Sequence, residues 1–201
     1  MILSFQRRFK VARHKEFDEA KVLQKAMVLF WKNGYEKTSM QDLVDYMNIH
    51  RRSIYDTFGH KQALFVRALQ LFEEMTEKRI KQQIEPIHSV KLAIRRLFEM
   101  TIISNEGQPP GCFIVNTAIE LTLHDQDVAD RIRKNFQKTE AFIYKLLLQG
   151  QTSGEISEQI DIGKLALSIH NSWIGLRVLA KTTEDKKILQ NIIDSSLAVL
   201  D

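Results

Sequence analysis

The sequence predicts an all-α protein. Apolar residues recur at spacings of three and four along most of the chain, and no alternating strand pattern persists. The 201 residues include only three prolines, so long helices are rarely interrupted. The composition, 44% hydrophobic and 27% charged, is that of an ordinary globular protein. No run of about 18 apolar residues occurs, so we expect no membrane partner. The single cysteine fits a reducing cytoplasm, where we expect the protein to be located.

The first third of the chain contains three short helices separated by tight breaks. We expect them at residues 16–33, 40–47 and 51–58. Gly34 and Gly59 directly follow the first and third helices, where glycine commonly ends a helix. Asn48 follows the second helix at a turn that favours positive φ, which asparagine tolerates better than other side chains.

The remaining helices are longer. We expect them at residues 61–84, 90–104, 113–123, 126–150, 163–181 and 184–200. Residues 105–111 form a loop that contains two prolines, and residues 151–161 form a polar connection. The natural boundary lies inside the first of these helices, so the two parts of the chain share it without a flexible linker.

Positive charge is concentrated near the N-terminus. Residues 1–67 contain 13 Lys plus Arg against 7 Asp plus Glu, whereas the remaining 134 contain 16 against 18. A basic segment on a slightly acidic body is typical of a nucleic-acid-binding module on a separate scaffold. An uneven scatter of surface lysines is the alternative.

The second and third helices fit a helix-turn-helix, in which two short helices cross steeply and the second enters a major groove. Ile54 and Phe58 are four residues apart and can pack on Leu43 and Met47. The other side chains of the third helix then face outward: Arg51, Arg52, Ser53, Tyr55 and Thr57. Two arginines at a helix start oppose the helix dipole, and DNA would compensate for this. A plain solvated face is the alternative.

These residues also carry a resemblance. The runs FWKNGYEKTSM (residues 30–40) and IYDTFGHKQALF (residues 54–65) closely resemble the signature of the TetR/AcrR family of one-component regulators. The resemblance implies a homodimer with an N-terminal DNA-binding domain, a connecting fourth helix, and a C-terminal ligand-binding and dimerisation domain. We therefore divide the chain into a basic extension (1–15), a helix-turn-helix domain (16–62) and a helical body (63–201).

The resemblance also implies DNA-contacting residues. Thr38 and Ser39 match a helix N-terminus that meets a phosphate. Arg51, Arg52 and Ser53 match the start of the recognition helix, which reads bases. Tyr55 matches a tyrosine that reaches the DNA backbone, and His60 and Lys61 match the opening of the fourth helix. A packed, half-exposed aromatic is the alternative for Tyr55, and an ordinary lysine at a helix start is the alternative for Lys61. Residues 1–13 are either a basic arm that reaches DNA or an extension without a role.

The body shows no catalytic pair and no metal-ligand spacing, so we expect a protein without enzymatic activity, cofactor or metal. Its single cysteine, Cys112, excludes an intramolecular disulfide. His170 and Trp173 lie within one turn of an apolar helix, and with Met100 and Phe136 they are candidates to line a ligand pocket. A satisfied core histidine is the alternative for His170.

The last two helices are apolar over a wide arc, which predicts a dimer interface there, as the resemblance also implies. The candidate interface residues are Leu165, Ile169, Leu176, Ile188, Ile192 and Ser195. Packing against the wall of a pocket is the alternative.

Cys112 has two interpretations. The segment from Pro109 to Glu120 is similar to a branch of the family in which Gly-Cys opens the sixth helix and a glutamate follows. A thiol at a helix N-terminus lies where the reactive thiolate is favoured, so Cys112 is a candidate sensor of electrophiles or oxidants. A small buried residue at the start of a packed helix is the alternative.

Together these features predict a homodimeric repressor that binds a palindromic double-stranded DNA operator. An unidentified small-molecule effector releases it, or alternatively modification of Cys112 does.

Overall fold

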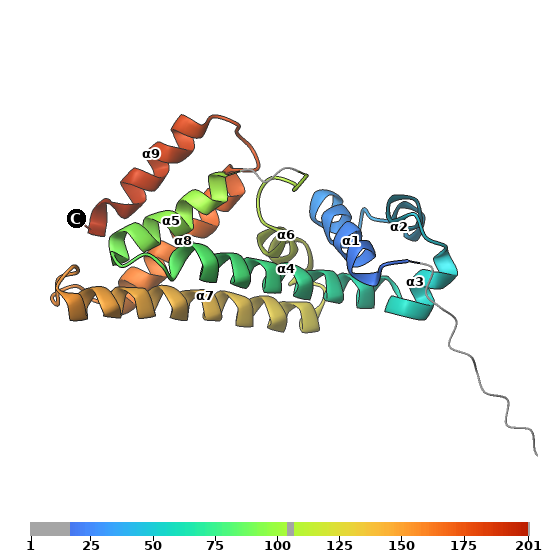
Figure 1. Cartoon of the computed structure of the whole chain (residues 1–201), viewed down its shortest axis with the longest axis horizontal. Coiled ribbons are helices and arrows are strands. Elements are labelled where there is room, and N and C mark those ends of the chain that lie inside the picture. Colours follow the sequence, from blue (N-terminus) through green and yellow to red (C-terminus); the bar gives the residue numbers. More distant parts are fainter. Residues whose placement is uncertain (1–16, 104–106, 201) are drawn as a thin grey trace, which may run out of the picture.

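The computed structural model describes residues 17–103 and 107–200, so the basic extension and its proposed arm lie outside the described residues. Every regular element in this described part is helical, which confirms the all-α prediction (Figure 1). The elements are α1 (Glu19–Asn33), α2 (Met40–Met47), α3 (Arg51–Phe58), α4 (Lys61–Ile84), α5 (Val90–Ile102), α6 (Phe113–Leu121), α7 (Gln126–Ser153), α8 (Ile162–Leu179), α9 (Lys186–Leu197) and the 3₁₀ turn η1 (Ala198–Leu200).

The breaks between the first helices are set by local chemistry. Gly34 has φ 86° and Gly59 has φ 82°, and Asn48 adopts the left-handed conformation with φ 57°. Ser39 begins α2 through a capping box, in which its hydroxyl accepts from the Asp42 amide and the Asp42 carboxylate accepts from the Ser39 amide. These are the positions at which the sequence predicted the ends and starts of helices.

The later helix ends differ from the prediction by a few residues. Helix α7 continues three residues past Gly150 and ends before Gly154, which has φ 77°. Gly150 is buried, and a Cβ built there would lie 2.5 Å from a side-chain carbon of Ile156. This glycine therefore allows a close approach inside the helix and does not end it.

Two buried clusters form the core. The first joins α1–α4 to α6 and the start of α7, and the second joins α5, α7, α8 and α9. An edge-to-face series of aromatic rings lies at the centre of the first cluster, with Phe65 of α4 5.1 Å from Phe30 of α1 and 5.5 Å from Phe113 of α6. A shared core thus joins the N-terminal helices to the body.

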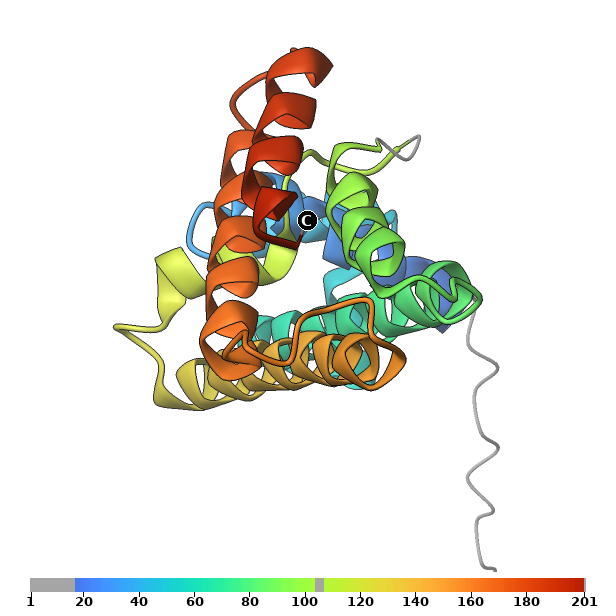
Figure 2. The same cartoon turned by 90° about the vertical axis from the view of Figure 1, so that its left-hand side faces the viewer.

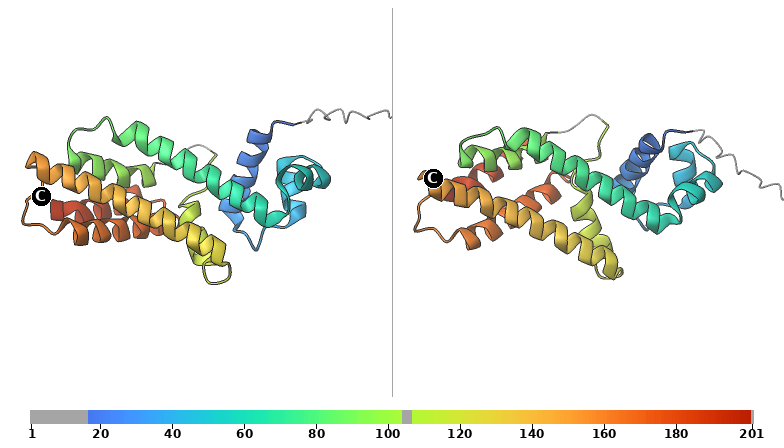
Figure 3. Two further views of the ribbon diagram at one scale, coloured as in Figure 1. Left: turned by 90° about the horizontal axis from the view of Figure 1, so that it is seen from below. Right: turned by 60° about the horizontal axis from the view of Figure 1, so that its bottom comes forward.

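The helices α1–α3 lie at one end of the molecule, and α4 extends from them into the body (Figure 3). Helices α7 and α4 are also linked by ion pairs, from Arg131 to Glu73 and from Lys138 to Glu77. Helices α8 and α9 lie together along one side of the body (Figure 2). The fold therefore separates the helix-turn-helix from the paired terminal helices.

Candidate DNA-binding surface and ligand cavity

The helix-turn-helix has the predicted internal packing. Leu43, Met47, Ile54 and Phe58 are all buried in the first cluster. Their burial fixes the rotation of α3, because residues on its opposite face must then point outward. The recognition helix thus presents one polar face to solvent.

The exposed face of α3 carries Arg51, Arg52 and Tyr55, while Ser53 is half-buried. Arg52 forms an exposed ion pair with Asp56 at 3.7 Å, a contact that contributes little in water. The N-cap residue His50 makes no side-chain capping bond, and the first turn of α3 contains no acidic residue. The positive end of this helix dipole is therefore open to an anion such as a phosphate.

The four remaining predicted DNA residues also make contacts within the fold. The Thr38 side chain is fully buried, and its hydroxyl donates to the Gly34 carbonyl at 2.6 Å, so it holds the turn and is not on the surface. The Lys61 ammonium lies 4.2 Å from the centre of the Tyr35 ring. Ser39 and His60 are exposed N-cap residues of α2 and α4, and His60 Nδ1 accepts from the Ala63 amide.

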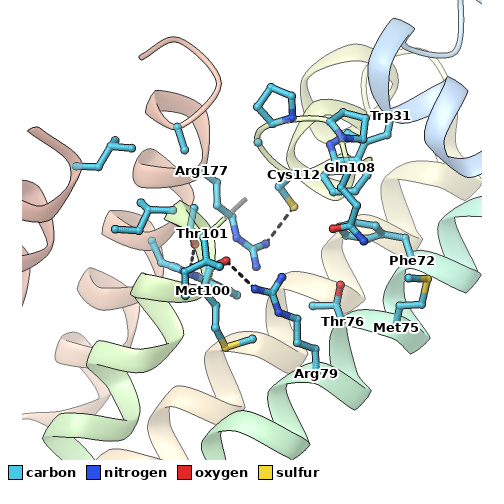
Figure 4. A pocket seen from close by; sticks show the side chains of 18 of the residues that line it. Trp31, Phe72, Met75, Thr76, Arg79, Met100, Thr101, Gln108, Cys112 and Arg177 are labelled. Atoms are coloured by element: carbon cyan, nitrogen blue, oxygen red, sulfur yellow. Dashed lines mark hydrogen bonds between the residues drawn. The ribbon is translucent and has the colours of Figure 1, made fainter. Parts of the chain in front are cut away.

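A cavity of about 580 Å³ lies between α1, α4, α5, α8 and α9, and the segment that leads into α6 forms part of its wall. This volume is in the usual range for a small-molecule site. Met100 and Cys112 line it (Figure 4). Trp173 lines it as well. Met100 and Trp173 were candidates for a pocket, and Cys112 was the candidate sensor. The indole N–H of Trp173 donates to the Leu97 carbonyl and the Thr101 hydroxyl, so the ring is held rigidly against α5.

Cys112 is the N-cap residue of α6 and is buried in the cavity wall. Its sulfur accepts a hydrogen bond from Arg177 Nη1 at 3.1 Å. The guanidinium carbon of Arg177 lies 3.4 Å from the centre of the Trp173 ring, a stacked cation–π arrangement. The cysteine is therefore in direct contact with a cation.

Phe136 and His170 do not line this cavity. They also do not line a smaller cavity of about 300 Å³, which shares Trp173 and Arg177 with the first. Their rings are 5.6 Å apart in an edge-to-face contact between α7 and α8. Burial, and then the charge of Arg177, lower the pKa of His170, so its ring is neutral at pH 7. Both residues thus pack helices together, which is the alternative that the sequence left open for His170.

The predicted interface residues divide into two groups. Leu165, Ile169 and Leu176 are buried in the core of this chain, so they are not available to a partner. Ile188 and Ser195 are exposed, and Ile192 is half-buried. The outer face of α8 and α9 consists of Leu167, Asn171, Gly175, Val178, Ile188, Asn191, Ser195 and Val199.

Helix α6 connects the cavity to the DNA-binding helices. Its first residue follows Cys112, and near its other end the Glu120 carboxylate accepts from the Tyr35 amide at 3.0 Å and the Glu36 amide at 2.9 Å. A Cβ at Gly34 would lie 2.8 Å from this carboxylate, so a glycine at this position allows Glu120 to approach the loop closely. Helix α6 therefore joins the cavity wall at Cys112 to the loop before α2 by direct contacts.

Three side chains at the cavity or on α6 were missed or given no role from sequence: Arg79, Arg177 and Glu120. A charged residue in an apolar helix is a signal that was available for Arg177, which lies one turn after Trp173. Arg79 lies in a mixed, polar stretch of α4 that contains no such contrast. The partners of Glu120 are 84 and 85 residues away along the chain, so no local pattern indicates them.

No helix in residues 17–103 and 107–200 is long and apolar enough to cross a membrane. The same residues contain no group of three or more histidine, cysteine or acidic side chains that could hold a metal ion.

Comparisons with known proteins identify the class. The family model described as "Bacterial regulatory proteins, tetR family" matches residues 22–68, and the model described as "Tetracyclin repressor-like, C-terminal domain" matches residues 93–195. The chain is 37% identical over 194 residues to the uncharacterized HTH-type transcriptional regulator YezE of Bacillus subtilis, covering 95% of this chain and 100% of that protein. It is 29% identical to the HTH-type transcriptional repressor ComR of Escherichia coli, over 92% and 90% of the two chains. The chain belongs to the TetR family and is a DNA-binding transcriptional regulator.

Solved structures agree with this assignment. The fold superposes with a TM-score of 0.85 on a cysteine mutant of the TetR family regulator CifR complexed with 26-bp operator DNA, at 25% identity and over 93% and 98% of the two chains. The reduced form of Escherichia coli NemR shares the fold, with a TM-score of 0.77 over 88% and 93% of the two chains, at 18% identity.

Proposed function

We propose that this regulator is a homodimeric repressor that a small-molecule effector releases from a palindromic operator. The observation that carries this proposal is the position of α6, which begins in the cavity wall at Cys112 and binds the DNA-binding helices through Glu120. Such a helix gives a bound molecule a physical route to the recognition helix.

Dimerisation on the outer face of α8 and α9 would set the distance between two recognition helices. Leu167, Val178, Ile188 and Val199 are exposed apolar side chains on this face. Gly175 has no atom within 4 Å of a built Cβ, so a partner helix can approach closely there. A twofold axis through this face would pair two copies of α3 with two half-sites of a palindrome.

Release then follows from a shift in population. The repressor samples arrangements in which the two recognition helices fit successive major grooves, and others in which they do not. An effector that binds more tightly to the arrangements that do not fit the operator moves α6 and shifts the population toward them. Operator binding then weakens in proportion to the ratio of the effector's two affinities. Because it binds DNA, the protein would act in the cytoplasm.

The test begins with an operator selected from random DNA duplexes by repeated binding. A gel shift combined with native mass measurement should show two protomers on one palindromic duplex. A single protomer bound with equal affinity to a half-site would contradict the proposal.

We expect Arg51 or Arg52 to read a guanine. Replacing the reading arginine with alanine should relax the preference at one base pair and cost roughly 1–3 kcal/mol there, because a bidentate contact is lost. Binding measured across all single-base variants of the selected operator checks this.

Lys61→Ala is the matched control, because Lys61 is expected to contact phosphate. It should weaken binding to all operator variants equally and reduce the salt dependence by about one ion. Uniform weakening by both arginine variants would contradict the base-reading assignment.

A thiol switch is the second candidate, favoured by the contact between Arg177 and the Cys112 sulfur at 3.1 Å inside the cavity. The sulfur of a cysteine is the atom that an electrophile or oxidant modifies, and here it lies in the cavity wall in contact with a cation. In this case a modified cysteine would take the place of a diffusible effector.

We expect the two candidates to separate on alkylation. Under the thiol switch, iodoacetamide displaces DNA as the Cys112 sulfur forms a bond to carbon and iodide leaves, and Cys112→Ser abolishes this release. The measurement is operator binding before and after alkylation, with mass spectrometry to confirm one added group. Release of the Cys112→Ser protein by the same treatment would rule the thiol switch out.

A further inference from the structure

Two arginines face the same cavity. Arg79 of α4 and Arg177 of α8 point into the space between α4 and α8 (Figure 4). Arg79 donates to the Met100 carbonyl at 3.3 Å, and Arg177 donates to the Cys112 sulfur. Within the described residues, neither guanidinium forms an ion pair, although other arginines of α4 and α7 do.

The proximity of these two cations is electrostatically costly. Burial lowers the pKa of Arg177, and burial together with the charges of Arg96 and Arg177 lowers the pKa of Arg79. A guanidinium has five N–H donors, so most of those on both side chains are left for another partner. An anion between the two arginines would relieve their repulsion and satisfy these donors.

The rest of the lining favours an apolar group attached to the charged group of such an anion. The wall is largely apolar and aromatic, with Met75, Met100 and Phe72 among its members. The indole N–H of Trp31, which also lines the cavity, is buried without a partner among the described residues and offers a further donor. Among the described residues of the lining, Glu184 is the only acidic one, and its side chain is exposed.

We infer that the effector is an amphipathic organic anion, with a carboxylate or sulfonate held by Arg79 and Arg177 and an apolar body against the aromatic wall. This inference rests on the proposed effector-released repressor and names the chemical class that its cavity takes. The inference predicts selectivity for charge as well as for shape, because the paired cations discriminate against neutral molecules of the same size.

Two fluorescent probes that differ in one charged group provide the test. 8-Anilino-1-naphthalenesulfonate is an anion, and N-phenyl-1-naphthylamine is the same ring system without the sulfonate. We expect Arg79→Met and Arg177→Met each to weaken binding of the sulfonate by about 10- to 100-fold, as expected for a lost charge-assisted contact. Binding of the neutral probe should change by less than about threefold, because methionine keeps the apolar stem.

Matched variants separate charge from packing. Arg79→Lys and Arg177→Lys keep the charge and should retain most of the preference for the sulfonate. Arg133→Met removes an exposed arginine of α7 that pairs with Asp130, and it should change neither probe. Equal loss of both probes, or no loss of either, in the Arg79 and Arg177 variants would overturn the inference.

The wild-type protein gives a readout that does not depend on folded variants. 1-Naphthoate should displace the neutral probe at a concentration at least about tenfold lower than the isosteric 1-naphthamide, because only a cationic site repays desolvation of the carboxylate. Equal displacement would overturn the inference. These binding measurements use no DNA, so their failure is distinct from a failure of operator binding, which would refute the proposed function itself.

Discussion

We expect Ile188→Glu to split the proposed dimer and to weaken operator binding strongly, although residue 188 lies on α9, away from the recognition helix. Ile188 is 50% exposed, so this chain tolerates a charge there when it is alone. In a dimer formed on this face, the same charge would be buried without a partner at a cost of several kcal/mol for each copy. Because one recognition helix buries too little surface for a tight site, loss of the dimer should weaken operator binding more than about 100-fold.

Analytical ultracentrifugation beside a gel shift measures both effects, and circular dichroism confirms the fold. Leu148→Glu is the matched control, because Leu148 is an apolar residue of α7 that is 46% exposed and lies outside the α8 and α9 face. It should leave both dimer and operator binding intact. Ile192→Glu is less suitable, since Ile192 also packs against the core of its own chain. An Ile188→Glu protein that remains dimeric and binds the operator would place the interface elsewhere.

Gly34→Ala should destabilise the contact between α6 and the DNA-binding helices. Gly34 has φ 86° and ψ 172°, a conformation that is costly for any residue with a Cβ, by roughly 1–3 kcal/mol. The new methyl group would also meet the Glu120 carboxylate at 2.8 Å and displace it from the Tyr35 and Glu36 amides. Loss of these charge-assisted bonds should add roughly 1–3 kcal/mol. Thermal unfolding and hydrogen exchange at the two amides measure the two effects.

Gly59→Ala is the matched control for backbone strain. Gly59 has φ 82° and ψ −150°, but a Cβ there would meet only the Ala63 Cβ at an ordinary 3.4 Å. We expect Gly34→Ala to lower Tm further than Gly59→Ala, by about 2–4 °C for each additional kcal/mol. In a Glu120→Ala background this difference should largely disappear, because the clash and the bonds are both absent. A difference that persists there would show that Glu120 does not hold the two parts together.

The DNA-binding end of the molecule was largely predictable from the sequence. Its signals are local: Gly34, Asn48 and Gly59 act through their own backbone angles, and the capping of α2 by Ser39 involves a residue three positions away. The spacing of Ile54 and Phe58 also determines which face of α3 is buried, once a core exists for it to meet. Such short-range effects act in the same way whatever the rest of the chain does.

The body was predicted less completely, because its helices are apolar on more than one side. The pattern of α8 indicates burial of Leu165, Ile169 and Leu176 but does not say whether a second copy or the same chain covers them. The structure shows that α5, α7 and α9 of the same chain do so, which leaves the opposite side of α8 as the outer face.

The sequence by itself determined the helices, the breaks between them and the polar face of the recognition helix, since these depend on neighbours within a few residues. Only the tertiary structure decided which residues line the cavity and how the cavity is linked to the DNA-binding helices. Arg79 and Arg177 are 98 positions apart in the numbering, and Glu120 contacts amides 84 and 85 residues away. Contacts at such separations arise when helices pack, and helix packing depends on the shapes of whole surfaces, which no local pattern of residues encodes.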